Sequence, residues 1–518
     1  MSVEKIVTAE KWLGSRASLA STSVAICGLI WRLWYATQTY LNPDEALHYT
    51  VAAHPWHGLV GFYRNATITT HPPLFMAVLE AVLHLGRSEW LLRLVPAVAG
   101  AMFPLCVMLW VRRLSGAGGA LAAQVVLTFS PSLIDLSTEV RGYTLAFLFL
   151  SIALLLLEEA LNTARTGCMV WFHVFVYLAT LTEYCVIWIV ASMGVYALCR
   201  LWRREAAGRL WAVWLLGQTG AFVLCLFLFY TQVARLSQGD LQATYSTWLQ
   251  GMFPQPGESP AMFALRGTVR QFLYLFQHRW PARLAAVVFL LGLYKLWKNK
   301  SGVYVLLLAL PFGLAAGAGI LHMFPYGPSR HTGVLCILIA AGLGCAIQSI
   351  AKNRILPVLG AALPLVIIWN LFSIDLSFAI PRDRRQISLM REAVMFLENT
   401  VPLGSVIVTD EGTDVMLGYY LGCPSFEYYD SNDSYYSRRC RGIQFIAAPT
   451  FQFSGTPQLQ AAFNQARARF HSDKPVWAAA GGFHIDVANP VSDSRPFGKV
   501  MAIFQEADLP PAAVTGPV

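Results

Sequence analysis

The chain is poor in charge. Asp, Glu, Lys and Arg make up 13% of its 518 residues, whereas hydrophobic residues make up 56%. This balance excludes an ordinary soluble protein of the same length, in which about a quarter of the residues are charged. The sequence therefore predicts a polytopic membrane protein.

Other common features are missing as well. The ten cysteines include no CxxC pair, and the chain has no internal repeat and no low-complexity tract. The formal charge of +9 does not indicate nucleic-acid binding, because the Lys and Arg residues form no continuous basic stripe. They fall in short clusters between apolar runs, where they indicate membrane topology.

Long apolar runs fill the first 375 residues. A helix needs about twenty apolar residues to cross a bilayer, and eleven such spans are predicted near residues 18–40, 89–111, 118–134, 141–160, 168–182, 184–202, 209–231, 281–297, 302–323, 332–350 and 354–374. The shorter run at 71–86 is predicted to lie in the interface, because only then do the later basic clusters share a side with the basic N-terminus. We therefore expect a cytoplasmic N-terminus and an outer C-terminus.

The expected fold is an all-α polytopic membrane bundle followed by a small extracytoplasmic α/β domain. The predicted boundary separates residues 1–375 from 376–518, where strand and helix patterns alternate. Two large outer loops are expected at 41–88 and 232–280, the second as either a lid or a spacer. Cys423 and Cys440 lie together in the polar part, where a disulfide is an open question.

Two adjacent acids, Asp44 and Glu45, follow the first apolar run. With Pro43 they suit the first turn of a helix, where acids favour the positive end of the helix dipole. Alternatively, a carboxylate partly desolvated at the lipid boundary has the chemistry of a general base. The spacing favours neither interpretation over the other.

Basic residues are expected on the same outer face. His71 precedes two prolines that begin a helix, Arg141 opens the fourth span, and the pair Arg330 and His331 precedes the tenth. Each is a candidate for binding a phosphate, because guanidinium and imidazole groups donate charge-assisted hydrogen bonds to it. Structural roles, such as helix capping or pairing with an acid, are the alternatives.

Four further residues are candidates for supporting roles: Arg93, Glu139, Tyr143 and Glu183. Taken singly, none of the candidates is specific. Together, acids and cations on one face of a membrane bundle provide what transfer from a lipid phosphate requires. Phosphate is a good leaving group once cations bind its charge, and a base for the incoming hydroxyl completes the reaction.

The order of these motifs resembles the GT-C glycosyltransferases of the protein O-mannosyltransferase and aminoarabinose transferase superfamily, which use polyprenyl-phosphate sugars. The resemblance rests on Pro43-Asp44-Glu45, His71-Pro72-Pro73-Leu74, Arg93-Leu94-Val95-Pro96, Arg141-Gly142-Tyr143 and Ser329-Arg330-His331. It covers roughly residues 20–350, and no motif extends it to the C-terminal domain.

The resemblance implies that Asp44 is the catalytic base, that Glu45 supports it, and that His71, Arg141, Arg330 and His331 lie near the donor phosphate. The chain also departs from the family pattern. Relatives commonly have Arg-Tyr where this chain has Arg330-His331, and some carry a lysine at the position of Glu183. These departures leave open how the phosphate is held.

The sequence thus predicts an inner-membrane (plasma-membrane) glycosyltransferase that works outside the cytoplasm and inverts the transferred sugar. The expected partners are a polyprenyl-phosphate sugar donor, membrane lipids and a lipid, glycan or protein acceptor. No nucleic acid, cofactor or metal is indicated. The rival interpretation is a transporter or lipid flippase, which Arg32 inside the first span would suit.

Overall fold

A computed structural model describes residues 3–54, 58–66, 71–203, 208–234, 249–299, 301–351, 384–423, 427–428, 436–448, 460, 463–468, 475–482 and 496–505. The chain divides into two compact units, each described by itself below. Unit 1 comprises residues 1–34, 70–75 and 93–376, and unit 2 comprises residues 35–69, 76–92 and 377–518. The predicted first outer loop thus belongs for the most part to the same unit as the C-terminal domain.

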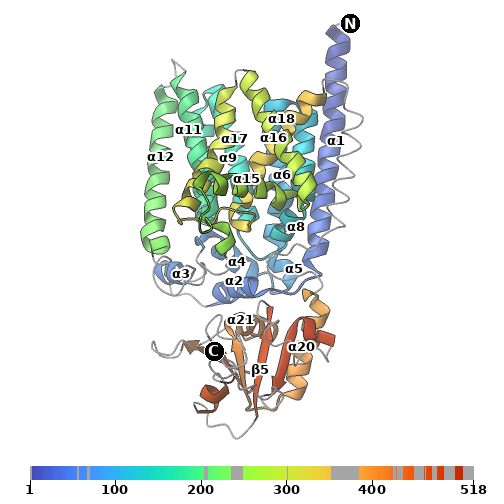
Figure 1. The fold of residues 1–518 in the computed structure, drawn as a ribbon, viewed down its shortest axis with the longest axis vertical. Helices are drawn as coiled ribbons and strands as arrows, with labels where there is room; N and C mark the ends of the chain where they lie inside the picture. Colours follow the sequence, from blue (N-terminus) through green and yellow to red (C-terminus); the bar gives the residue numbers. More distant parts are fainter. Residues whose placement is uncertain are drawn as a thin grey trace. The chain divides into compact units, whose positions relative to one another are not determined.

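Unit 1 is a bundle of long helices that run side by side (Figure 1). Its helices are α1 (Val3–Ala36), which begins in this unit, α6 (Leu94–Ser115), α7 (Ala117–Phe129), α8 (Pro131–Ser137), α9 (Tyr143–Thr163), α10 (Thr166–Thr182), α11 (Ile187–Trp202), α12 (Gly208–Leu228), α15 (Pro260–Phe276), α16 (Arg279–Lys298), α17 (Gly302–Ile320) and α18 (Cys336–Ala351). Short turns of other helix types are η2 (Tyr184–Val186), η3 (Phe229–Val233), η4 (Gln250–Met252) and η5 (Arg330–Leu335).

The described helices confirm a multi-pass membrane bundle. Eight are long and apolar enough to cross a membrane, or nine if the bent pair α7 and α8 is one span. Of the other predicted spans, 168–182 corresponds to the shorter apolar helix α10, and 354–374 lies outside the described residues. The run at 71–86 yields α4 (Leu74–Leu83), whose ten residues are too few to cross.

The predicted third span is broken. The axes of α7 and α8 differ by 60°, and the break falls at Ser130, whose backbone is extended before Pro131. Proline cannot donate the backbone hydrogen bond that would continue the preceding helix, which explains the position of the break. The broken backbone leaves carbonyl groups that need other partners.

Arg32 supplies one of those partners from α1. Its buried guanidinium donates to the carbonyl oxygen of Thr128, 2.9 Å away, and to Ser137 Oγ, 2.8 Å away. A third bond reaches the carbonyl of Gly28 within α1. Arg32 therefore stabilises the break between α7 and α8, and this structural role removes the main reason to favour a transporter.

Small residues allow close contacts between the helices. A Cβ atom at Gly119 would lie 2.2 Å from the carbonyl oxygen of Gly344, and one at Gly292 would lie 2.2 Å from that of Gly342. Contacts of this kind between α7, α16 and α18 are typical of membrane helices, whose backbones approach where side chains are small.

Unit 2 combines short helices with an α/β sheet. Its elements are α2 (Pro43–Ala53), α3 (Gly58–Ala66), most of α4, α5 (Glu89–Leu92), α20 (Ile387–Thr400), β1 (Val406–Asp410), α21 (Glu411–Tyr420), β2 (Glu427–Tyr428), β3 (Tyr436–Cys440), β4 (Ile443–Ala448), β5 (Val476–Gly481), η8 (Pro496–Lys499) and β6 (Met501–Gln505). The described strands form a sheet in the order β2-β3-β4-β1-β5-β6, with β1 parallel to β4 and β5.

The alternation of side chains along β1 gives the sheet two apolar faces. Ile407 joins one buried cluster, together with Met390 of α20 and Met416 of α21. Its neighbours Val406 and Val408 join a cluster on the opposite face. The α/β domain predicted from the sequence is therefore confirmed, although α20 and the short strands β2 and β3 were not predicted.

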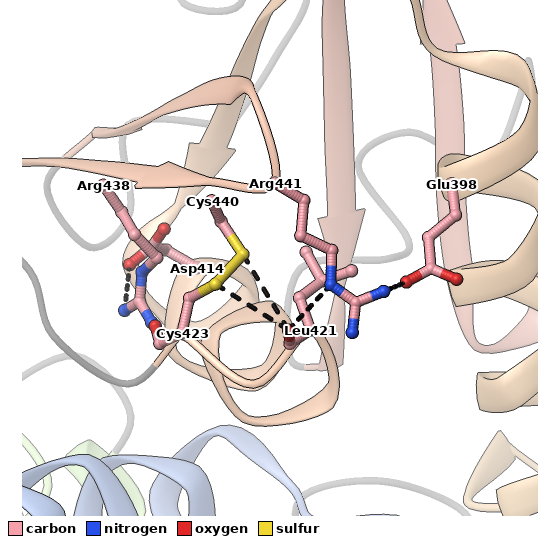
Figure 2. The surroundings of a disulfide bond; sticks show 7 residues. All are labelled: Glu398, Asp414, Leu421, Cys423, Arg438, Cys440 and Arg441. Carbon is pink, nitrogen blue, oxygen red and sulfur yellow. Dashed lines mark hydrogen bonds and ion pairs between the residues drawn. A yellow bond between two sulfur atoms is a disulfide. The ribbon is translucent and has the colours of Figure 1, made fainter. Parts of the chain in front are cut away.

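The disulfide left open by the sequence is present between Cys423 and Cys440, whose Cα atoms lie 5.9 Å apart. Figure 2 shows it beside two ion pairs. Arg438 donates to the buried carboxylate of Asp414 at 2.7 Å and to the carbonyl of Cys423, and Arg441 pairs with Glu398. The disulfide and Arg438 tie β3 to α21 and to the residues that follow it, whereas Arg441 ties the turn after β3 to α20. A disulfide is typical of an oxidising compartment.

This disulfide predicts a count of free thiols. Eight of the ten cysteines are free, so denaturation of the membrane-expressed protein without reductant should expose eight thiols to a maleimide mass tag, and reduction should expose ten. The variant Cys423→Ser/Cys440→Ser should give eight under both conditions. Ten reactive thiols in the unreduced wild-type protein would contradict the bond.

Candidate active site

The residues singled out in the sequence lie in both units. His71, Arg93, Glu139, Arg141, Tyr143, Glu183, Arg330 and His331 belong to unit 1, whereas Asp44 and Glu45 belong to unit 2. Within unit 1, the ends of several helices bring most of the first set together. The roles assigned to these residues stay predictions.

His71 links an acid to a guanidinium. Its Nδ1 lies 3.1 Å from Glu183 Oε2, and its Nε2 lies 3.5 Å from Arg141 Nη1. Since guanidinium groups only donate, Nε2 accepts and Nδ1–H donates to the carboxylate. Glu183 ends α10 in an extended conformation, and its side chain is 5% exposed. The Glu183 carboxylate is thus paired with His71.

Arg141 also contacts an acid on its own loop. Its Nε lies 3.6 Å from Glu139 Oε2, and its side chain is 3% exposed. Gly142 makes this arrangement possible, because a Cβ atom there would lie 2.9 Å from Thr182 Cγ2 and 3.2 Å from Glu183 Oε1. Glu139 and Glu183 place negative charge beside Arg141 and compensate the charge of its buried guanidinium.

Aromatic rings extend from His71 to the turn that precedes α18. The ring of Tyr143 lies edge-on to His71 at 6.0 Å and to His331 at 6.3 Å, and its hydroxyl is 3.5 Å from His331 Nδ1. Phe324 continues the row at 6.4 Å from His331. Arg330 is half-buried at the start of η5, next to His331. These contacts bring the late turn to the same cluster as His71.

Arg93 occupies a different position. It is fully buried, and it caps the start of α6, where its carbonyl accepts a hydrogen bond from Ala97. One turn further, the carbonyl of Pro96 accepts a bond from Thr144 at the start of α9. Arg93 thus lies at the same end of the helix pair α6 and α9 as Arg141.

In the described part of the predicted second loop, residues 249–280, Arg266 makes several of the contacts. Arg266 of α15 donates through Nε and Nη2 to the two carboxylate oxygens of Glu258, each at 2.7 Å, and these hydrogen bonds lower the pKa of Glu258 to about 2. Arg266 also donates to the carbonyl of Gly251. From this loop, the carbonyl of Met252 accepts from the Tyr326 amide, in the turn before Arg330. Residues 249–258 are therefore attached to the turn that carries two of the candidate cations.

In unit 2, the start of α2 has the helix-capping geometry that the sequence suggests. The Asn42 side chain accepts from the Glu45 amide at 3.0 Å, and the Glu45 carboxylate accepts from the Asn42 amide at 3.0 Å. This reciprocal pair is a capping box, which satisfies two backbone donors that a helix start leaves without partners. Glu45 is therefore a structural residue of the helix start.

A buried arginine completes the environment of Glu45. Arg385 Nη2 lies 3.9 Å from Glu45 Oε2, and the two side chains are 1% and 0% exposed. The carbonyl of Arg385 also accepts a hydrogen bond from the Tyr40 amide. Burial raises the pKa of the Tyr40 phenol, Arg385 opposes that rise and Glu45 adds to it. The carboxylate and the guanidinium compensate each other away from water.

Asp44 differs from its neighbour because it is only half-buried. Its carbonyl accepts a hydrogen bond from His48 Nδ1 at 2.7 Å, so Nδ1 carries the proton of this bond. The two adjacent acids therefore differ in their surroundings. Glu45 is buried in the capping contacts of the turn, whereas the Asp44 side chain is partly exposed.

The C-terminal domain holds α2 in place. The rings of Tyr49 and Tyr419 meet edge-on at 4.8 Å, and the Leu41 amide donates to the Tyr420 hydroxyl at 3.0 Å. A Cβ atom at Gly482, whose φ is +59°, would lie 2.5 Å from Pro43. Both the positive φ and the close approach require glycine here.

Sequence reasoning missed Arg385 and His48. Arg385 follows an apolar run and has no motif around it, so only the fold shows that it reaches Glu45. His48 had a usable signal, since it stands four residues after Asp44 on the same helix face. Among the described residues, no group of three or more His, Cys, Asp or Glu is placed to hold a metal ion.

Comparison with known proteins identifies the fold. Residues 70–230 match the family model described as dolichyl-phosphate-mannose-protein mannosyltransferase. The crystal structure of ArnT from Cupriavidus metallidurans in the apo state aligns with a TM-score of 0.53 at 14% identity, over 98% of this chain and 100% of that chain. The same protein bound to undecaprenyl phosphate gives 0.52 at 14%, over 97% and 99%. The chain has a GT-C fold.

Other comparisons add less. The oligosaccharyltransferase AglB from Archaeoglobus fulgidus, in complex with an inhibitory peptide and a dolichol-phosphate, aligns with a TM-score of 0.49 at 11% identity, over 91% of this chain and 70% of that chain. None of the curated protein sequences matches. The family match and the GT-C fold together point to a glycosyltransferase.

The capping geometry predicts different effects for the two acids. Glu45→Ala removes the cap and leaves the Arg385 charge buried without its acid, which costs about 3–5 kcal/mol. We expect hydrogen–deuterium exchange of the full chain in detergent to show at least about 100-fold faster exchange of the α2 amides.

Asp44→Ala is the matched control, because it removes the neighbouring half-buried acid from the same turn. It should change the exchange rate of the same amides by no more than about fivefold, since an acid in the first turn contributes up to about 1 kcal/mol. Equal effects of the two substitutions would contradict the capping role of Glu45.

Proposed function

We propose that this protein transfers a sugar from a polyprenyl-phosphate donor to an acceptor outside the cytoplasm. The observation that carries the proposal is the likeness to ArnT over nearly the whole of both chains, because one of those structures holds undecaprenyl phosphate. The matched family is named for a dolichyl-phosphate sugar, which is the same class of donor. The matched range, residues 70–230, contains His71, Arg141, Tyr143 and Glu183.

The proposed reaction is a single displacement at the anomeric carbon. Asp44 accepts the proton of the acceptor hydroxyl while the acceptor oxygen forms a bond to C1 of the sugar. The bond between C1 and the phosphate oxygen breaks, and its electron pair leaves with the polyprenyl phosphate. One displacement inverts the configuration at C1. The half-buried position of Asp44 supports this role, because a base must meet its substrate and still be partly desolvated.

The proposed phosphate ligands are Arg141, Arg330, His71 and His331. Guanidinium and imidazole groups stabilise the charge that the phosphate gains as the sugar leaves. In this interpretation Glu183 and Glu139 are positioning residues, since they hold His71 and Arg141 by contacts of 3.1 and 3.6 Å. Glu45 is likewise a positioning residue for Asp44.

The proposed location is the inner (plasma) membrane, with a cytoplasmic N-terminus and an extracytoplasmic C-terminal domain. The multi-pass bundle supports the membrane, and the basic clusters support the orientation. The Cys423–Cys440 disulfide supports an oxidising compartment for the C-terminal domain. The acceptor is a lipid, a glycan or a protein. Mass spectrometry of envelope glycans and lipids from cells with and without the gene would identify it.

Asp44→Asn should abolish transfer in membranes supplied with a lipid-linked sugar. Loss of a general base lowers a rate by about 10²–10⁴-fold, and the amide preserves the shape of the side chain, so expression should stay normal. Glu398→Gln is the matched control, because Glu398 is an acid of the same unit that pairs with Arg441. Unchanged transfer by Asp44→Asn would remove the proposed mechanism.

Arg141→Gln should raise the KM for the lipid-linked donor by about 10–100-fold, the loss expected for one charge-assisted hydrogen bond worth about 1.5–3 kcal/mol. Arg141→Lys should restore part of the affinity, because it keeps the charge but loses the planar fork. Steady-state kinetics at varied donor concentration measure both. Arg279→Gln, an exposed cation at the start of α16, should leave the KM unchanged.

A KM for Arg141→Gln equal to that of Arg279→Gln would argue against a phosphate-binding role. The same outcome would leave Arg141 as a partner of Glu139 and His71 only.

A further inference from the structure

A second polar site lies at the other end of unit 1. The helices α6 and α9 begin near His71 and Arg141, and α9 extends 21 residues, or about 30 Å, away from them. Where both helices end, the bundle contains a cavity of about 720 Å³ lined by Arg112, Arg113, Glu159 and Arg165 together with three leucines. The proposed transfer reaction makes no use of this cavity.

The cavity carries a net positive charge, because it has three guanidinium groups and one carboxylate. Arg113 is held in place by Glu159, 3.2 Å away, and by the carbonyl of Leu155. Arg112 and Arg165 are exposed, and neither side chain has a hydrogen bond or an ion pair to the part of the chain that the structure describes. Two guanidinium groups that face one cavity thus retain their donors for a ligand.

The rest of the cavity wall is apolar. Leu109 is 43% exposed on α6, and Leu155 and Leu156 are half-buried on α9. Both helices are candidate membrane spans, so their ends lie at the level of lipid headgroups and these leucines lie toward the acyl chains. A soluble anion would contact the arginines but would gain nothing from the leucines.

We propose that this cavity binds an anionic glycerophospholipid, with the phosphate between Arg112 and Arg165 and the start of the acyl chains along Leu109. The charge selects an anion, and the volume suits a headgroup. The combination of cations and apolar wall selects a lipid over free phosphate. The site does not depend on the transfer reaction, so it can fail or succeed separately from the proposed function.

Native mass spectrometry of the delipidated full chain tests the proposal, with dioleoylphosphatidylglycerol as the probe. The first lipid should bind about 30-fold more weakly to Arg112→Gln/Arg165→Gln than to the wild type, as expected for the loss of two headgroup contacts. Leu109→Asp should weaken binding as well, because it places an acid in the apolar wall.

The matched control is Arg203→Gln/Lys298→Gln, which removes two exposed cations outside the cavity. These residues lie at the same end of the bundle, because Arg200 of α11 donates to Asn162 of α9 and Tyr304 of α17 donates to Glu158. This variant should bind the probe within about twofold of the wild type.

Three outcomes would overturn the proposal. The first is equal weakening by the control, which would mean that any basic residue at this end attracts the lipid. The second is equally tight binding of dioleoylphosphatidylcholine, which lacks the net charge. The third is displacement of the lipid by low-millimolar inorganic phosphate, which would identify a site for the free anion.

Discussion

A fully buried carboxylate needs compensating partners, and the position of the candidate base depends on how Glu45 finds them. Glu45 accepts a hydrogen bond from the Asn42 amide and lies beside the buried guanidinium of Arg385. An unpaired charge at this depth would cost several kcal/mol, so the contacts hold the start of α2 in one conformation. Because Asp44 is the preceding residue of the same turn, its backbone is held in that conformation as well. In the proposed mechanism, the two adjacent acids therefore have different tasks.

The C-terminal domain contributes to the same constraint. No motif in that part of the chain suggests a function, yet α21 packs against α2 through Tyr419 and Tyr420, and Arg385 leads into α20. The disulfide and the buried pair of Arg438 and Asp414 stabilise the end of α21. The contacts within unit 2 therefore explain what the domain does for the candidate base. It provides the surface against which the helix that carries Asp44 is held.

Much of this arrangement could be predicted from the sequence, because it depends on local patterns. The apolar runs predicted the spans. The positions of the basic clusters predicted that residues 71–86 do not cross the membrane. Motifs led to His71, Arg141 and His331. Other features depend on contacts between distant segments. No local sequence pattern indicates the pairing of Glu45 with Arg385 or that of His71 with Glu183. Nor does any local pattern indicate that the predicted first outer loop packs against the C-terminal domain. The bend at Ser130 had a signal in Pro131, but the role of Arg32 in stabilising it required the fold.

The central claim is that one carboxylate, acting as a base, drives a single displacement of a lipid phosphate. The stereochemistry of the product tests this claim most directly, because it depends on the number of displacements at C1 and on no assumption about the acceptor. Nuclear magnetic resonance of a ¹³C-labelled sugar, before and after transfer by the wild-type protein, gives the anomeric configuration through the one-bond coupling at C1. The account predicts inversion. Retention would require a covalent intermediate or a different reaction and would contradict the role given to Asp44.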